Sequence, residues 1–205
     1  MVNRLTAPAE TTSAAYLRTA SATQPTHRSA VVWLTGLSAA GKSTIAGRVA
    51  DELRAQGRRT YTLDGDDLRS GLCSDLGFSL EDRTENIRRA AQVARLLLAA
   101  DLTVLCTFIS PLEVDRRAAR RIVGDDDFLE VYVQTPIEAC IARDPKGLYQ
   151  RALAGEIPDF TGISSPYEPP ADPDLVVGTG AQSLDACVRS VLELLDAHDS
   201  AYNGS

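Results

Sequence analysis

The sequence predicts an α/β fold in three layers: a parallel five-stranded sheet flanked by helices, with a lid segment beyond the sheet. Short apolar runs alternate along the chain with amphipathic helical patterns. The chain has 205 residues, 44% of them hydrophobic, which is enough for one sizeable core. Strands that alternate with helices form parallel sheets covered on both faces, so ligands are expected beyond the carboxyl ends of the strands.

The expected elements follow one another in regular alternation. The expected strands are residues 31–35, 60–63, 103–108, 129–133 and 175–177. The expected helices are residues 42–56, 82–100, 113–123, 136–143 and 183–197. The second of these helices has an apolar face, formed by Ile87, Ala91, Ala94 and Leu98. Ser79 precedes it and is expected to cap its N-terminus.

The expected domain comprises residues 30–198. Three segments, two outside this domain and one within it, lack the regular alternation of strands and helices. Residues 1–29 are rich in Ala, Thr and Ser without sustained periodicity, which predicts a flexible arm with a short helix near residues 14–19. Residues 143–170 mix cations, Gly, Pro and isolated aromatics between two expected strands. We interpret that stretch as a lid, with a long irregular surface loop as the alternative. Residues 199–205 are expected to be a tail.

Composition argues against several classes of protein. The net charge of −7 disfavours a dedicated nucleic-acid binder. No apolar run approaches membrane-spanning length, and the start of the chain shows no apolar signal core. The four cysteines lack metal-ligand or CxxC spacing, which predicts reduced thiols in a cytoplasmic protein. They are Cys73, Cys106, Cys140 and Cys187.

The sequence GLSAAGKS at residues 36–43 fits the phosphate-loop pattern G-x-x-x-x-G-K-[ST], between an expected strand and an expected helix. Its backbone N–H groups and the helix N-terminus are expected to hold phosphates. Lys42 would neutralise the β- and γ-phosphates, and Ser43 would offer its hydroxyl to Mg²⁺. The expected nucleotide contacts are Gly36, Leu37, Ser38, Ala39, Ala40, Gly41, Lys42, Ser43 and Thr44. The motif fits GTPases, ATPases and small-molecule kinases alike.

Two carboxylates follow the second expected strand. Asp64 and Asp66 flank a glycine in LDGDDLR, residues 63–69. A carboxylate at this edge can accept a proton from an acceptor hydroxyl or hold Mg²⁺ through water. A solvated acidic turn is the alternative, and the neighbouring phosphate loop favours the catalytic interpretation.

The next helix carries a candidate anion clamp. Arg83 and Asn86 are three residues apart and share a helical face. An Arg fork and an Asn amide suit a phosphate or sulfate group. Phe78 could stack on a base. Without that context the segment is an ordinary solvated helix start.

Ser110 ends the third expected strand in CTFISP and is expected to point into the cleft. A ligand contact, a nucleophile and a helix cap remain open for it. In the lid, Arg143 and Lys146 would bring charge over the phosphates, and Phe160 would offer a ring face. Closure would exclude water from the phosphoryl group.

Six motifs together resemble the adenylylsulfate kinases in order and spacing, from about residue 31 to residue 177: GLSAAGKSTIA, LDGDDLRSGL, DLGFSLEDRTENIRR, FISP, ARDPKGLY and FTGISSPYEPP. The resemblance implies a P-loop NTPase fold and a P-loop kinase domain. It also implies transfer of the γ-phosphoryl of ATP to the 3′-hydroxyl of adenosine 5′-phosphosulfate (APS). The products would be ADP and 3′-phosphoadenosine 5′-phosphosulfate (PAPS), with Mg²⁺ as cofactor, in sulfate assimilation. The family is commonly dimeric, which implies a homodimer.

The resemblance also implies residue roles. The catalytic residues would be Lys42, Asp64 and Ser110, with Asp64 orienting or deprotonating the 3′-hydroxyl. The family's serine is often described as a phosphoserine intermediate, although direct in-line transfer needs none. Arg143 would contact the ATP base. The implied acceptor contacts are Asp64, Asp66, Arg69, Phe78, Arg83, Asn86, Ile109, Ser110, Lys146, Phe160 and Thr161.

The chain departs from the family pattern at three places. Ala39 replaces a usual Gly and is expected to be tolerated only at negative φ. Asp67 replaces a usual Asn and would repel an anionic acceptor unless it is paired or turned away. Cys73 and Ser74 replace a polar–basic pair. These departures motivate an alternative, a related kinase with another nucleotide-like acceptor. A non-catalytic nucleotide-binding module is a further alternative, disfavoured by the intact Lys42, Ser43 and Asp64.

Overall fold

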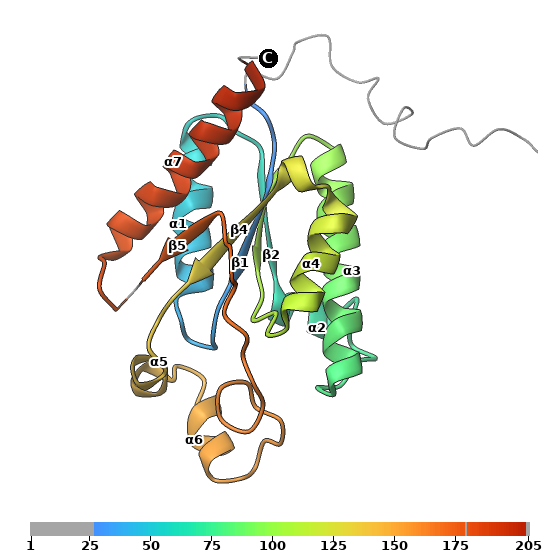
Figure 1. Ribbon diagram of the computed structural model, residues 1–205, viewed down its shortest axis with the longest axis vertical. Helices are drawn as coiled ribbons and strands as arrows, with labels where there is room; N and C mark the ends of the chain where they lie inside the picture. The colour runs from blue at the N-terminus through green and yellow to red at the C-terminus, as the bar shows by residue number, and fades with distance from the viewer. Residues whose placement is uncertain (1–26, 179, 204–205) are drawn as a thin grey trace, which may run out of the picture.

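The computed structural model describes residues 27–178 and 180–203, so the short helix expected near residues 14–19 lies outside the described range. One parallel sheet runs through the described chain in the order β2–β3–β1–β4–β5 (Figure 1). The strands are β1 (Val31–Thr35), β2 (Thr60–Asp64), β3 (Thr103–Thr107), β4 (Phe128–Val133) and β5 (Leu175–Val177). The predicted five-stranded parallel sheet is confirmed.

Helices cover both faces of this sheet. Figure 1 shows α1 and α7 on one face and α3 and α4 on the other, while α5 and α6 lie beyond the carboxyl edge. The helices are α1 (Lys42–Ala55), α2 (Gly65–Ser70), α3 (Leu80–Ala99), α4 (Glu113–Val123), α5 (Ile137–Arg143), α6 (Leu148–Leu153) and α7 (Leu184–Asn203), with a 3-10 turn at Asp125–Asp127. Within the described residues, no helix combines the length and apolar character needed to cross a membrane.

The central strand β1 supplies side chains to two hydrophobic clusters, because successive side chains of a strand point to opposite faces. Val32 and Leu34 belong to the cluster under α1 and α7, and Val31 and Trp33 to the cluster under α3 and α4. All of β1 is buried. The loop that follows β1 therefore starts from a rigid support.

The sequence did not predict the short helices α2 and α6, because six residues are too few to show a helical period. The predicted cap of α3 is confirmed, since the Ser79 side chain accepts a hydrogen bond of 3.1 Å from the Asp82 N–H. The helix itself begins at Leu80, slightly before the expected start.

The last helix continues past its expected end at residue 197, and tertiary contacts hold the extra turn. Asp199 of α7 is 7% exposed. It accepts hydrogen bonds from the Arg28 N–H at 2.9 Å and Arg58 Nη1 at 3.0 Å, and its Oδ2 lies 3.3 Å from His27 Nδ1. The beginning of the described chain is thereby tied to α7 at the edge of the sheet opposite the phosphate loop.

Candidate active site

The phosphate loop joins β1 to α1 at the carboxyl edge of the sheet. Gly36 and Gly41 have φ values of 149° and 108°. A Cβ built on Gly36 would lie 2.7 Å from the carbonyl oxygen of Val133, so only glycine lets the loop pass the end of β4. The loop thus enters α1 with its N–H groups at the helix N-terminus, as the motif predicts.

Ala39 corrects one expectation from the sequence. Its φ is 57°, in the left-handed region, and not negative as we expected. Such a conformation costs an L-residue about 1–2 kcal/mol. The chain therefore tolerates backbone strain at the position where the family usually has glycine.

Ala39→Gly is expected to raise the free energy of unfolding by about 0.5–1 kcal/mol, since relief of strain exceeds the added entropy of the unfolded chain. Urea denaturation of the variant and its parent measures this difference in the free energy of unfolding. Ala154→Gly is a matched control at an exposed position with φ −77°, where glycine should destabilise instead. An Ala39→Gly variant no more stable than its parent would contradict strain at this position.

Lys42 is 8% exposed and lies under the loop. Its Nζ donates hydrogen bonds to the carbonyl oxygens of Gly36 at 2.9 Å and Leu37 at 2.7 Å. Burial lowers the pKa of Lys42 to about 8. The cation is therefore held where phosphates are expected, and its charge is sensitive to what occupies the loop.

Asp64 is the centre of a hydrogen-bond cluster at the ends of β2 and β3. Its Oδ2 accepts from Ser43 Oγ at 2.8 Å and Thr107 Oγ1 at 2.6 Å, and its Oδ1 accepts from the Asp66 N–H at 2.9 Å. Burial raises the pKa of this carboxyl, but the three hydrogen bonds together outweigh burial, so the pKa lies below its ordinary value. Asp64 is consequently ionised at neutral pH.

Thr107 is a residue that sequence reasoning missed. It pairs with Asp64 in the register of β2 and β3. The available signal was its place as the polar residue near the carboxyl end of a largely apolar strand, in CTFISP. Without the register, nothing connected it to a carboxylate 43 residues away.

The contact between Ser43 and Asp64 brings together two oxygen donors, the ligand type that Mg²⁺ prefers. No group of three His, Cys, Asp or Glu side chains suitable for a metal occurs in residues 27–178 and 180–203. Mg²⁺ bound with nucleotides typically uses one or two protein ligands together with phosphates and water. The residues present fit such an ion.

The lid meets α2 through an ion pair between Lys146 and Asp66. The hydrogen bond to Asp66 raises the pKa of Lys146, and the charges of Asp64 and Asp67 contribute. Asp67 is exposed on α2. The structure therefore brings together Lys146 and Asp66, two of the expected acceptor contacts. The extra negative charge of Asp67 acts on the Lys146 cation.

Arg83 fastens the lid to α3. Its Nε donates to the Phe78 carbonyl at 2.9 Å, Nη1 to Thr161 Oγ1 at 2.8 Å, and Nη2 to the Asp159 carbonyl at 2.6 Å. All three nitrogens are engaged by the protein, so Arg83 is not the free anion fork that we expected. The neighbouring Asn86 is 5% exposed, and its Oδ1 has no hydrogen-bond partner among the described residues.

The two aromatic rings expected around the acceptor lie in different environments. Phe78 is 60% exposed, with the guanidinium of Arg69 4.4 Å from its ring centroid. Arg69 also donates to the Gly77 carbonyl at 2.7 Å. Phe160 is 8% exposed and packs against Tyr149 with ring centroids 5.0 Å apart. The expected free ring face of Phe160 is therefore wrong for this conformation, because the ring completes the core.

Ser110 does not point into the cleft as expected. It is 2% exposed, and its Oγ accepts from Trp33 Nε1 at 3.2 Å and donates to Thr35 Oγ1 at 3.0 Å. It does not cap α4 either, because Leu112 holds the N-cap position. Its φ of 38° is strained for a non-glycine residue. Ile109 precedes it, and its carbonyl accepts from Thr35 Oγ1 at 2.7 Å.

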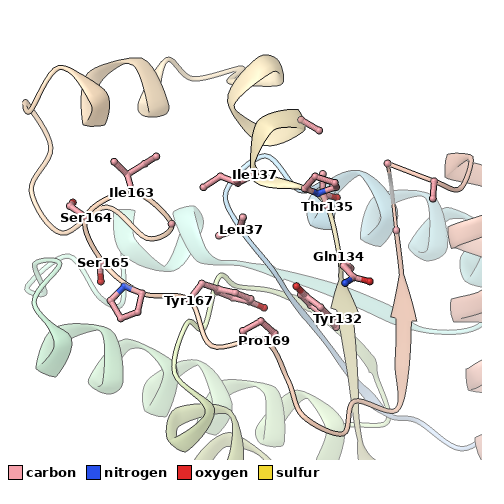
Figure 2. A pocket seen from close by; sticks show the side chains of 17 residues that line it. Leu37, Tyr132, Gln134, Thr135, Ile137, Ile163, Ser164, Ser165, Tyr167 and Pro169 are labelled. Atoms are coloured by element: carbon pink, nitrogen blue, oxygen red, sulfur yellow. The ribbon is translucent and has the colours of Figure 1, made fainter.

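A cavity of about 1090 Å³ opens beside the phosphate loop. Figure 2 shows Tyr132 and Gln134 at the end of β4 facing Tyr167 and Pro169, with Leu37 nearby. Tyr167 and Pro169 belong to residues 166–170, the part of the lid that leads back towards β5 and is called the return segment below. Sequence reasoning named Leu37 alone among these residues. Tyr167 and Pro169 lie in the motif FTGISSPYEPP, which pointed to the family but assigned no role to these two residues, and Tyr132 and Gln134 lie at the end of an expected strand.

Comparison with known proteins agrees with this geometry. The family model described as adenylylsulphate kinase matches residues 28–178. An adenylyl-sulfate kinase of Shewanella amazonensis is 55% identical over 174 residues, 85% of this chain and 88% of that protein.

Solved structures give the same result. The Mycobacterium tuberculosis APS kinase CysC, in complex with AMPPNP and APS, has a TM-score of 0.80 and 48% identity over 83% of this chain and 99% of that chain. A hexameric APS kinase from Thiobacillus denitrificans has a TM-score of 0.62 and 29% identity, over 85% of this chain and 30% of that one. The described fold, phosphate loop and sequence identity converge: the chain belongs to the adenylylsulphate kinase family and is an ATP-dependent kinase.

Proposed function

We propose that this chain transfers the γ-phosphoryl group of ATP to the 3′-hydroxyl of APS, giving PAPS and ADP. The observation that carries the proposal is the Asp64 cluster. An ionised carboxylate, fixed by Ser43 and Thr107, lies at the carboxyl edge of the sheet beside the phosphate loop. Family membership supplies the identity of the acceptor.

In the proposed mechanism the loop and Lys42 hold the β- and γ-phosphates of ATP, and Arg143 contacts the base. Asp64 accepts a hydrogen bond from the acceptor hydroxyl and aims its oxygen at the γ-phosphorus. The lowered pKa of Asp64 favours orientation over strong basicity. Transfer is direct and in line, because positioning and charge stabilisation suffice. The 3′-oxygen bonds to the γ-phosphorus as the bond to the β-phosphate oxygen breaks and ADP leaves, and the hydroxyl proton passes through Asp64 to solvent. The buried Oγ of Ser110 takes no phosphoryl group.

We infer that Mg²⁺ is held by Ser43, with Asp64 acting through water. When bound, the ion would neutralise charge on the phosphates as the phosphoryl group moves. Both side chains offer hard oxygen atoms, and Ser43 Oγ already lies 2.8 Å from the carboxylate.

On the acceptor side, the proposal assigns contacts to Asp66, Arg69, Phe78 and Lys146. The exposed face of Phe78 suits the adenine, and Lys146 brings a cation from the lid. Asn86 supplies a buried carbonyl oxygen without a partner among the described residues. The remaining proposed contacts are Arg83, Ile109, Ser110, Phe160 and Thr161. Those whose polar groups or rings already contact other parts of the protein would act by supporting the wall of the acceptor pocket.

The test is ADP release from Mg·ATP with APS, and separately with AMP, CMP or a cytidine diphosphate derivative as acceptor. Strong stimulation by APS alone is the expected result. Stimulation by another acceptor alone would keep the donor site and overturn the acceptor, with Asp67 and Ser74 the first positions to change. No turnover with any acceptor would favour a nucleotide-binding module.

ATP binding is expected to take up protons near pH 8.5. The pKa of Lys42 is about 8 in the free chain, so much of this amine is neutral at that pH. Phosphate favours the charged form, so the pKa rises on binding and a proton is taken up from solution. Calorimetry in two buffers of different ionisation enthalpy measures it. Lys42→Arg, charged throughout, should abolish the buffer dependence; the same enthalpy in both buffers for the unaltered chain would contradict the lowered pKa.

We also propose that the chain is a homodimer in the cytoplasm. The support is the family's common assembly and the four buried cysteines, which are free thiols. The hexameric relative from Thiobacillus denitrificans makes a larger assembly an outcome to distinguish. Light scattering coupled to size exclusion measures the mass directly: two chains support the proposal, and one or six contradict it.

A further inference from the structure

Three hydroxyl groups form a relay of hydrogen bonds beside the proposed acceptor contacts Ile109 and Ser110; those of Thr35 and Ser110 are buried, and that of Tyr167 is partly buried. Thr35 ends β1, Ser110 follows β3, and Tyr167 belongs to the lid's return segment. Thr35 Oγ1 lies 3.0 Å from Ser110 Oγ and 3.0 Å from the Tyr167 hydroxyl. The relay therefore joins a central strand, the loop after β3 and the lid.

The direction of each hydrogen bond follows from counting hydrogens. Thr35 donates its single hydroxyl hydrogen to the Ile109 carbonyl at 2.7 Å. It must then accept from both Ser110 and Tyr167. The Tyr167 hydroxyl is thus a donor at the end of the relay, and removing that one oxygen leaves the aromatic ring in place.

The loop at Ile109 and Ser110 is braced from the opposite side as well. Trp33 Nε1 donates to Ser110 Oγ at 3.2 Å, and Arg116 Nη1 donates to the Ser110 carbonyl at 2.8 Å. A strained backbone such as that of Ser110 persists only where its surroundings over-determine it. Trp33 and Arg116 belong to the sheet and α4, so Tyr167 is the member of this set that comes from the lid.

The backbone strengthens the connection between lid and loop. The Glu168 N–H donates to the Pro111 carbonyl at 2.8 Å, and the Glu168 carboxylate accepts from the Glu113 N–H at 2.7 Å. Figure 2 shows Tyr167 along the wall of the cavity, with Tyr132 beside it. Their ring centroids are 6.1 Å apart. The return segment is therefore seated on the same loop that the relay fixes.

We propose that Tyr167 is a positioning residue for the acceptor: its hydroxyl, through Thr35, couples the seat of the lid to the loop of Ile109 and Ser110. This inference rests on the proposed function only for the identity of the acceptor. Tyr167 acts through Thr35 and touches no reacting atom. Its loss should therefore change how well the acceptor is held and leave ATP binding alone.

Tyr167→Phe is expected to raise KM for APS about three- to tenfold, the usual effect of losing one neutral hydrogen bond. KM for ATP should stay within about twofold, because the phosphate-loop contacts are unchanged. Tyr132→Phe is the matched control, since Tyr132 stacks on Tyr167 and its hydroxyl has no hydrogen bond within the described part of the chain. Thr35→Val removes all three hydrogen bonds of the Thr35 hydroxyl and should raise KM for APS at least as much as Tyr167→Phe does, whereas Thr35→Ser, which keeps the hydroxyl, should leave that KM unchanged.

A second readout needs no activity. Trp33 is the single tryptophan of the sequence and donates directly to Ser110, so its fluorescence reports on the relay. In the chain without ligands, Tyr167→Phe and Thr35→Val should shift Trp33 emission or its quenching by acrylamide. Tyr132→Phe and Thr35→Ser should not.

The two readouts separate the possible failures. If the unaltered chain does not use APS, the proposed function fails, and the Trp33 response still tests the relay. If the chain uses APS and Tyr167→Phe leaves its KM unchanged, the positioning role is overturned. Equal increases in KM for APS and ATP, or lowered thermal stability with unchanged kinetics, would mean a merely structural role and would also overturn it.

Discussion

Lys42→Ala is expected to reduce phosphoryl transfer by at least about 10²–10³-fold, the usual effect of removing one preorganised group that stabilises developing charge. Lys42 is buried under the phosphate loop, and its amine is held there by two of the loop's carbonyl groups. Initial rates of ADP formation with saturating ATP and APS measure the effect. Near-normal turnover would remove Lys42 from the donor site.

Two controls make this result interpretable. Deleting the amine removes the Lys42 donor from the Gly36 carbonyl and leaves the Leu37 carbonyl with only the Ala40 N–H at 3.2 Å, so thermal unfolding must show that the variant is folded. Lys42→Arg keeps the charge in a different shape. Partial activity in that variant would indicate that charge itself contributes, while equal loss in both would indicate that the geometry of the amine is decisive.

Asp64→Asn is expected to lower kcat by about 10²-fold or more, with the dissociation constant of ATP changed only slightly. The substitution keeps the shape of the side chain and removes its charge. The amide nitrogen would then face the hydroxyls of Ser43 or Thr107, which now donate to a carboxylate. The acceptor hydroxyl would lose its orienting anion, whereas the loop that binds the triphosphate would keep its contacts.

Separate measurements of kcat and of ATP binding distinguish orientation from binding. An Asp64→Asn variant that loses ATP affinity and keeps its kcat would refute the orienting role. Asp66→Asn is the matched comparison two residues away. Its partner is Lys146 of the lid, so it should raise KM for the acceptor and spare kcat.

Much of the architecture was predictable because it depends on local pattern. The apolar strands and the phosphate loop carry their own signals, and Asp64 stands at the end of a strand next to a glycine. Parallel strands align their carboxyl ends, which is why the sequence alone places Asp64 and Ser43 at the same edge of the sheet. The helix α3 could likewise be predicted, from its apolar face and from Ser79 as its N-cap.

What could not be predicted depends on partners far away in the chain. Ser110 is buried because Trp33, 77 residues earlier, donates to its hydroxyl. The register of β2 and β3 decides that Thr107 meets Asp64. Ala39 takes its left-handed conformation from the turn of the loop and not from its own preference. Arg83 is drawn to the lid by Thr161 and the Asp159 carbonyl, contacts that no spacing within α3 could reveal.

The contacts of Asp199 have a practical consequence for handling the molecule. His27 and Arg28 are clipped to α7 by this carboxylate, so both ends of the described chain leave from one pole, opposite the lid (Figure 1). A force that pulls these two ends apart would therefore break the hydrogen bonds of Asp199 before it disturbed the catalytic edge of the sheet. Attachment to a surface, or fusion to another protein, at either of these ends should therefore leave the phosphate loop and the lid accessible to substrates.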